Sequence, residues 1–257
     1  MRKLNEAGYI FAILPLLLGI TLCVSAFLFN YIAGARAVSE TQKAADGFAL
    51  KATDEIASGL NRIAELNLLL KGILASVLSL EGATVLSGGT ASPATLKAIS
   101  MLMRMSRTVA KAQEILLKTT VLKVHVEWQA WKRKLRPATL ALFPPYPLYP
   151  KEMPVTLELH VRRRPPQHPG IPGYLELENH FMQRQYLRVR VTKRIEILKE
   201  QSLQPESKKM TLQSEAFAAP IGAESLMTPR WRSALISPYE VQHPRRAWRT
   251  RSRYESN

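Results

Sequence analysis

The chain has 257 residues and a formal net charge of +16, with 36 lysines and arginines against 20 aspartates and glutamates. Its single cysteine, Cys23, has no partner in the chain, which excludes an intrachain disulfide framework and a cysteine zinc site. The excess charge lies in the second half, because residues 122–257 hold 24 basic and 12 acidic side chains whereas residues 36–121 hold ten and seven.

The first element in the chain is an apolar run that has no charged side chain between Glu6 and Arg36. As a helix, residues 9–32 would be about 36 Å long, which is enough to cross a hydrocarbon core of roughly 30 Å. We therefore expect residues 1–35 to form a cytoplasmic tip and a transmembrane anchor. Pro15 would kink this membrane helix without ending it.

The flanks of the run indicate its orientation. A short N-terminal tail with Arg2 and Lys3 favours a cytoplasmic N-terminus and an extracytoplasmic (periplasmic) position for the bulk of the chain, anchored in the inner (cell) membrane. A cleaved signal peptide is the alternative, because Ala33-Gly34-Ala35 has the pattern of a cleavage site. The apolar run is longer than the 7–15 residues of an ordinary signal peptide, which favours an uncleaved anchor.

Residues 36–136 are expected to form two long antiparallel helices. The first continues out of the membrane from Arg36 to Leu80, and its apolar side chains recur at steps of three and four. This stripe consists of Phe48, Ala52, Ile56, Leu60 and Ile63. An apolar stripe on a helix is a surface for lateral packing, so we interpret Pro15 and the stripe through Phe48, Ile56 and Ile63 as the membrane and assembly face.

The second helix is predicted to begin after a turn at Gly88-Gly89. Ser92 is suited to the N-cap position and Pro93 to the first helical position, and Pro137 ends the helix after about Arg136. Its apolar stripe is expected to consist of Leu102, Met105, Val109, Ala112 and Leu116.

The rest of the chain predicts a small antiparallel sheet with irregular flanks. Residues 137–154 contain six prolines and three aromatic residues, which is typical of an extended linker or strap. Residues 155–200 contain three alternating segments, at 155–161, 174–181 and 186–197. Periodicity fades after Glu200, so residues 201–257 are expected to be a poorly ordered basic tail with one or two local elements. The predicted fold class is α+β.

The sequence contains none of the catalytic motifs that we looked for, and we expect no enzyme activity, no cofactor and no small-molecule substrate. Glu176, Glu178 and His180 could share one strand face, but a solvated strand face explains them better than a metal site. The C-terminal half contains arginines interleaved with aromatic residues. These could bind an anionic lipid surface or an acidic partner, or they could form a solvated basic tail with no dedicated ligand. No nucleic acid is expected outside the cytoplasm. The candidate anion-binding residues are Arg188, Arg190, Arg230, Arg232, Arg245, Arg246 and Arg249.

Three N-terminal segments resemble the TadE/TadG-type proteins of tight-adherence (Tad, Flp) pilus systems. They are Glu6-Ala7-Gly8, residues 11–20 (FAILPLLLGI) and residues 40–50 (ETQKAADGFAL). TadE-like pseudopilins have a glutamate five residues after the cleavage glycine, but the corresponding position here is Ile13. The resemblance covers about the first 60 residues and is closer to the TadG-like, unprocessed branch.

Two functions follow from these observations. The resemblance implies a non-enzymatic, membrane-anchored pilus-assembly or pseudopilin-like protein, with membrane lipid and other pilus-assembly or pilin-like proteins as its partners. The alternative is a membrane-anchored binding protein that uses its basic C-terminal half on an anionic surface, a polymer or an acidic partner.

Overall fold

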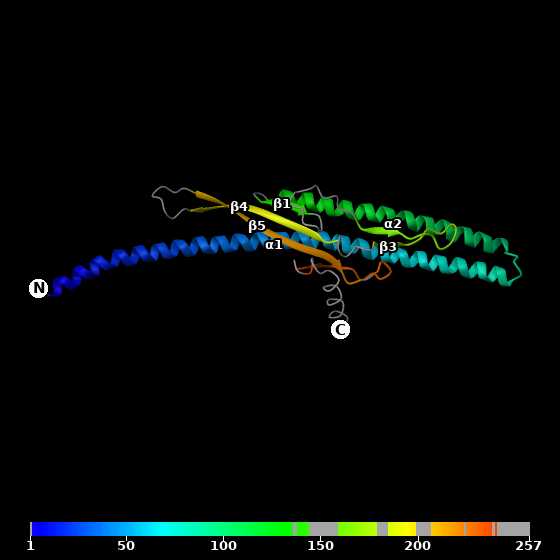
Figure 1. The fold of residues 1–257 in the computed structure, drawn as a ribbon, viewed down its shortest axis with the longest axis horizontal. Coiled ribbons are helices and arrows are strands. Elements are labelled where there is room, and N and C mark those ends of the chain that lie inside the picture. Colours follow the sequence, from blue (N-terminus) through cyan, green and yellow to red (C-terminus); the bar gives the residue numbers. More distant parts are fainter. Residues whose placement is uncertain are drawn as a thin grey trace.

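Residues 2–86 form one helix. The computed structural model describes residues 2–135, 138–143, 159–178, 185–198, 207–223, 225–237 and 240. Helix α1 (Arg2–Leu86) has 85 residues and is therefore about 130 Å long. It continues through Pro15, and its N-terminal part extends alone beyond the rest of the molecule (Figure 1). The expectation of an apolar N-terminal helix that continues directly into a long second part is confirmed.

Helix α2 (Pro93–Lys134) returns along the C-terminal part of α1 (Figure 1). The turn between the helices places Gly88 and Gly89 at φ +80° and +81°, where a side chain would be strained. The Ser92 hydroxyl accepts a hydrogen bond of 3.1 Å from the Thr95 N–H, so Ser92 caps the helix as predicted. The last turn carries three basic residues, which favourably oppose the helix dipole.

The strands form two antiparallel sheets. The larger has the order β1-β4-β5-β6 and contains β1 (Thr139–Phe143), β4 (Leu187–Leu198), β5 (Ser207–Ile221) and β6 (Arg232–Leu235). The smaller pairs β2 (Val161–Arg163) with β3 (Leu175–Leu177). The antiparallel sheet is confirmed, and it also includes strands from two segments in which no sheet strand was predicted. The expected linker 137–154 contains β1, and the expected irregular segment 201–257 contains β5, the longest described strand, and β6.

Strand β5 was missed because most of its inward positions are small or polar. Buried residues on β5 include Leu212, Ser214, Ala216 and Ala218, which give only a weak hydrophobic alternation. The strand is instead held by register: β4 and β5 pair along twelve consecutive positions, from Leu187↔Ala218 to Leu198↔Ser207.

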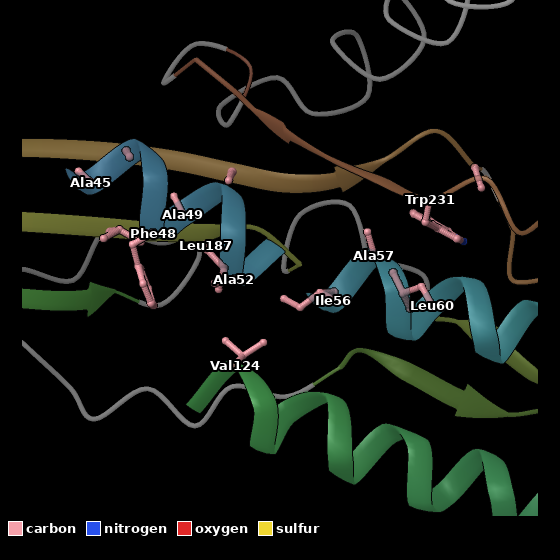
Figure 2. Close-up of a cluster of buried hydrophobic side chains, with 14 of the residues drawn as sticks. Ala45, Phe48, Ala49, Ala52, Ile56, Ala57, Leu60, Val124, Leu187 and Trp231 are labelled. Carbon is pink, nitrogen blue, oxygen red and sulfur yellow. The ribbon is translucent and has the colours of Figure 1, made fainter. Parts of the chain in front are cut away.

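The main core lies along the middle of α1, between the larger sheet and α2 (Figures 1 and 2). The Phe48 ring contacts two tryptophans of α2 edge-on, with centroid distances of 5.4 Å to Trp128 and 6.0 Å to Trp131. Val189 and Val191 of β4 belong to the same cluster. Several buried positions of α1 are alanines, which allow neighbouring backbones to approach closely: Ala45, Ala49, Ala52, Ala57 and Ala64.

The buried face of α2 differs from the expected stripe. Of that stripe only Val109 is buried, and Met105 is 44% exposed. The observed inward face of α2 is rotated about the helix axis relative to the predicted one, and it is partly polar. This face consists of Ser106, Val109, Ala110, Gln113, Thr120 and Val124.

Candidate functional site

The N-terminal segment of α1 is apolar and open to solvent. Its large apolar side chains are between 38% exposed at Ile13 and 72% exposed at Phe29. Within the described part of the chain, α1 is the one helix that is long and apolar enough to cross a membrane, judged by length and composition. The Thr21 hydroxyl donates to the Leu17 carbonyl at 2.8 Å, so this polar group is satisfied inside the helix, as hydrocarbon surroundings require. Pro15 lies in this segment.

The stripe that we interpreted as an assembly face is the core of the domain. Phe48, Ile56 and Ile63 are all 0% exposed and pack within the chain, and Figure 2 shows Phe48 and Ile56 in the buried cluster with Val124 of α2 and Leu187 of β4. The stripe therefore offers no surface to a second protein in this fold. The physical reason is that the sheet and α2 cover the apolar face that the helical periodicity revealed.

Asn67 of α1 is the centre of a buried polar network. Its amide nitrogen donates to the carbonyls of Leu175 (2.7 Å) and Leu226 (2.8 Å). Its amide oxygen accepts from the Leu175 N–H (2.9 Å) and from the Gln113 side chain (2.8 Å). Both donors and both acceptor sites of the amide are thus used. This residue connects α1 to α2, to β3 and to the loop before β6.

The network continues from Gln113 to Arg163 of β2. The guanidinium donates to the Gln113 side-chain oxygen (3.1 Å) and to the Gly173 carbonyl (2.8 Å), and also to the Ala110 carbonyl (3.2 Å). Amide side chains do not titrate and the guanidinium remains charged, so this cluster fixes geometry and supplies no general acid or base. No sequence pattern indicated this network, because isolated polar residues on a helix resemble solvent-exposed ones.

A second, partly buried contact attaches the edge of the sheet to α1. The Asn61 side chain donates to the Trp231 carbonyl (2.9 Å) and accepts from the Trp231 N–H (2.7 Å). Trp231 is 4% exposed and directly precedes β6. The position of β6 is thereby fixed relative to α1.

Arg188 and Arg190 point outward from β4, but both are paired with Glu215 of β5. Arg188 approaches the carboxylate at 3.1 Å and stacks over the Phe217 ring, with its guanidinium carbon 5.7 Å from the centroid. Arg190 donates from Nε at 2.6 Å. Their side chains are 12% and 27% exposed. Glu215 already serves as the anionic partner that we expected these arginines to find outside the chain.

Two of the other predicted anion-binding residues lie at the start of β6. Arg230 and Arg232 are exposed on either side of Trp231. Arg245, Arg246 and Arg249 lie outside the described residues.

The acidic side chains of the strand face considered as a metal site each contact a basic side chain. Glu176 approaches Arg162 at 2.9 Å and Glu178 approaches His160 at 3.4 Å, whereas His180 lies outside the described residues. In the described ranges no group of three or more histidine, cysteine, aspartate or glutamate residues is arranged to hold a metal ion.

Strands β4 and β5, which we call the β4–β5 ribbon, run beside α1 toward its apolar segment (Figure 1). Lys193 of β4 approaches Glu40 of α1 at 3.3 Å. The hydrogen bond and the charge of Lys193, assisted by Arg36, lower the pKa of the Glu40 carboxyl below its ordinary value of 4.5. The ribbon continues five residues farther, to Leu198, which corresponds to about 17 Å. On α1, the eight residues back from Glu40 to Ile32 span about 12 Å. The outer end of the ribbon thus reaches the level at which the apolar run ends.

Comparisons of the chain with protein-family models, with curated proteins and with solved structures found no match.

Proposed function

We propose that this chain is a non-enzymatic, single-pass protein of the inner (cell) membrane that acts as a pilus-assembly or pseudopilin-like component of a Tad/Flp-type system. The observation that carries the proposal is the construction of α1. One uninterrupted helix has an exposed apolar N-terminal part and a C-terminal part packed against an antiparallel sheet. This architecture suits pilin-like proteins, and the N-terminal sequence resemblance favours the same class. The N-terminus is cytoplasmic and the packed domain is periplasmic.

The first experiment tests the retained anchor. The full chain is expressed in its source organism and recovered from the membrane fraction, and its intact mass and N-terminal sequence are measured. We expect residues 9–32 to be present in the mature protein. A mature chain that begins at Arg36 would refute the anchor and favour a cleaved signal peptide.

The second experiment tests the pilus role. Deletion of the gene should abolish or strongly reduce surface pili, and the full chain supplied in trans should restore them. A variant with Leu17→Arg and Leu18→Arg places two charges in the apolar segment, where each costs about 2.5–3.5 kcal/mol at the centre of a membrane helix. Arg36→Lys, which conserves charge at the end of the segment, is the matched control. Normal piliation in the deletion strain would refute the proposal.

A second candidate function is binding to an anionic membrane surface, and the position of the β4–β5 ribbon favours it. The ribbon carries exposed Arg194, and its sequence adds Lys208 and Lys209 near the outer end. In the proposed orientation this end lies at the level of the lipid headgroups. Phosphate groups there would attract these cations, with an interaction that is screened beyond about 8 Å at physiological ionic strength.

The full chain in nanodiscs tests this function. Amide hydrogen exchange of β4 residues 194–198 should be slower in anionic than in zwitterionic lipid at low salt, and the difference should disappear at high salt. Arg194→Glu with Lys209→Glu should remove the effect, whereas Arg162→Glu, away from the ribbon, should preserve it. Equal exchange in both lipids would contradict the contact.

A further inference from the structure

We propose that the outward face of α2 is the docking site for an amphipathic helix of another protein, one with apolar side chains at alternating steps of three and four and acidic side chains along one flank. The inference rests on the proposed assembly function and identifies the chemistry of the partner.

The outward face of α2 contains an uninterrupted heptad pattern. Eight uncharged residues follow one another at alternating steps of four and three, and we call them the α2 seam. Such spacing is the pattern by which helices pack side by side in coiled coils. The seam rises about 38 Å along the helix. It consists of Met101, Met105, Thr108, Ala112, Ile115, Thr119, Leu122 and Val126.

The seam faces solvent in the described part of the chain. Met101 is 65% exposed, Ile115 62%, Leu122 60% and Val126 59%. A helix that packs on its own domain through one face normally carries polar residues on the other. Here the outward face also carries large aliphatic side chains, in addition to the inward face, where Val109 and Val124 are buried beside Gln113. A second helix covering the seam would explain why α2 is apolar on both faces.

A row of basic residues borders the seam. These residues are exposed and recur at steps of seven. Each lies directly before a seam position, or before the equivalent position of the heptad. They are Lys97, Arg104, Lys111, Lys118 and His125. Among the residues that the structure describes, the ion pairs of α2 involve other side chains, namely Lys123 with Glu55, Glu127 with Lys51 and Glu114 with Arg163. A partner helix would therefore gain most from glutamate or aspartate on the flank that meets this row.

The opposite border of the seam adjoins α1. Leu116, Thr119 and Lys123 of α2 line a shallow groove together with Glu55 and Arg62 of α1. The docking helix would lie over α2 with one side along this groove. It would thus be apolar where it meets the seam, polar beside α1 and acidic beside the basic row.

Charge argues against a second copy of this chain as the occupant. Antiparallel pairing of two α2 helices would place the two basic rows opposite each other. Parallel pairing would place each basic row opposite the flank of Leu102, Val109 and Leu116, which packs toward α1. Residues 241–257 contain five arginines and one glutamate, so they would also meet like charge.

Geometry argues against the lipid bilayer. The groove beside the seam includes Glu55, which lies 23 residues after Ile32 on the same helix and so about 35 Å beyond the apolar run. Helix α2, which carries the seam, lies beside the C-terminal part of α1, beyond the apolar segment (Figure 1). A partner helix therefore remains as the occupant that fits both the spacing and the charge.

The test uses the full chain in nanodiscs and two synthetic peptides. Both peptides have 28 residues with leucine and isoleucine at 3–4 spacing, and one flank is glutamate in the first and lysine in the second. We expect the glutamate peptide to bind, by fluorescence anisotropy, about tenfold more tightly than the lysine peptide at low salt. Lys111→Glu with Lys118→Glu should reverse this preference, and Ile115→Asp with Leu122→Asp should abolish binding of both peptides. These side chains are exposed, so circular dichroism and thermal unfolding should remain as in the wild type. Equal binding of the two peptides, or no binding, would overturn the proposal.

A second measurement identifies the natural occupant. A photo-crosslinking residue at Leu122, in cells of the source organism, should capture a segment of a different protein with the stated apolar spacing and acidic flank. The same residue at Lys132, outside the seam, is the control. Crosslinks to a second copy, to residues 241–257 or to lipid would overturn the inference. If the crosslinked partner has these properties but deletion of the gene leaves piliation intact, the docking site stands and the pilus function fails.

Discussion

The contact between α1 and α2 depends on the absence of a side chain at Gly59. A Cβ atom at this position would lie 2.4 Å from Oγ1 and 2.7 Å from Cγ2 of Thr120. Thr120 is 4% exposed, and its hydroxyl donates to the Leu116 carbonyl at 2.8 Å. Because a β-branched side chain in a helix has few rotamers, it has little freedom to move away. Gly59→Ala should therefore push the two helices apart.

Two opposing effects set the magnitude. Replacing glycine by alanine inside a helix stabilises it by about 0.5–1 kcal/mol. Overpacking a buried contact costs about 1–3 kcal/mol. Gly72 of the same helix has no atom within 4 Å of the added carbon, so Gly72→Ala should show the helix gain alone. We expect Gly59→Ala to be less stable than Gly72→Ala by about 1–3 kcal/mol.

The assay is thermal unfolding of the full chain in detergent, followed by tryptophan fluorescence. Trp128, Trp131 and Trp231 all lie in or against the main core, so their emission reports its loss. Thr120→Ala in the Gly59→Ala background removes the two closest atoms and leaves a contact of 3.1 Å, and it should restore most of the stability. Equal stabilisation by the two glycine substitutions would refute the close packing of α1 on α2.

Three further substitutions test the core, the polar network and the ribbon. Phe48→Ala should lower the free energy of unfolding by about 3–5 kcal/mol, because the Phe48 ring is fully buried between tryptophans. Leu69→Ala, at an exposed position, should change it by less than about 0.5 kcal/mol, and equal effects of the two substitutions would contradict the assigned core. Asn67→Ala leaves the Leu175 N–H and the carbonyls of Leu175 and Leu226 without this hydrogen-bond partner, so it should lower the free energy of unfolding by at least about 3 kcal/mol in the same assay. A decrease of less than about 1 kcal/mol would mean that the network is replaceable. Because Lys193 lowers the pKa of Glu40, the stabilisation of the ribbon by this pair is complete above pH 4.5 and is lost as the pH falls through the lowered pKa. Glu40→Gln should remove this acid dependence from the amide hydrogen exchange of β4. An unchanged acid dependence would argue against the pair.

The helices could be predicted because their signals are local. An uncharged run followed at once by an apolar stripe indicates one continuous helix, and Ser92-Pro93 is a strong start signal. The boundaries were close: α2 ends at Lys134, two residues before Arg136, whereas α1 ends at Leu86, six residues after Leu80.

The sheet could be predicted only in part, because the pairing of its strands depends on residues that are far apart in the sequence. Strand β4 alternates clearly through Leu187, Val189 and Val191, but its partner β5 places Ser214 and Ala216 in the same layer. The pairing of Arg188 and Arg190 with Glu215 depends on the β4–β5 register, so it could not be predicted from a sequence in which β5 had not been identified as a strand.

Periodicity also identifies an apolar face without identifying what covers it. The stripe through Phe48 and Ile56 was correctly recognised as one face of a helix, and its assignment to an assembly partner was wrong because the chain's own sheet and α2 occupy it. On α2 the opposite occurred. The expected stripe included Met105 and Ala112, which belong to the outward-facing seam. Among the residues that pack inward, Gln113 donates to Asn67 and Thr120 packs closely against Gly59.

The short distance between the apolar run and the packed domain has a consequence for how copies of this protein would be arranged. Ala37 and Thr41 are already buried, so packing begins about 8 Å beyond Ile32 on the same unbroken helix. A helix that is continuous through this junction transmits its direction to the domain, as a flexible linker would not. In the proposed arrangement, the ribbon end is therefore held at the membrane surface and the seam at a fixed height above it. Neighbouring copies would present their seams at equal heights, which is the geometry that a helical partner of an anchored assembly requires.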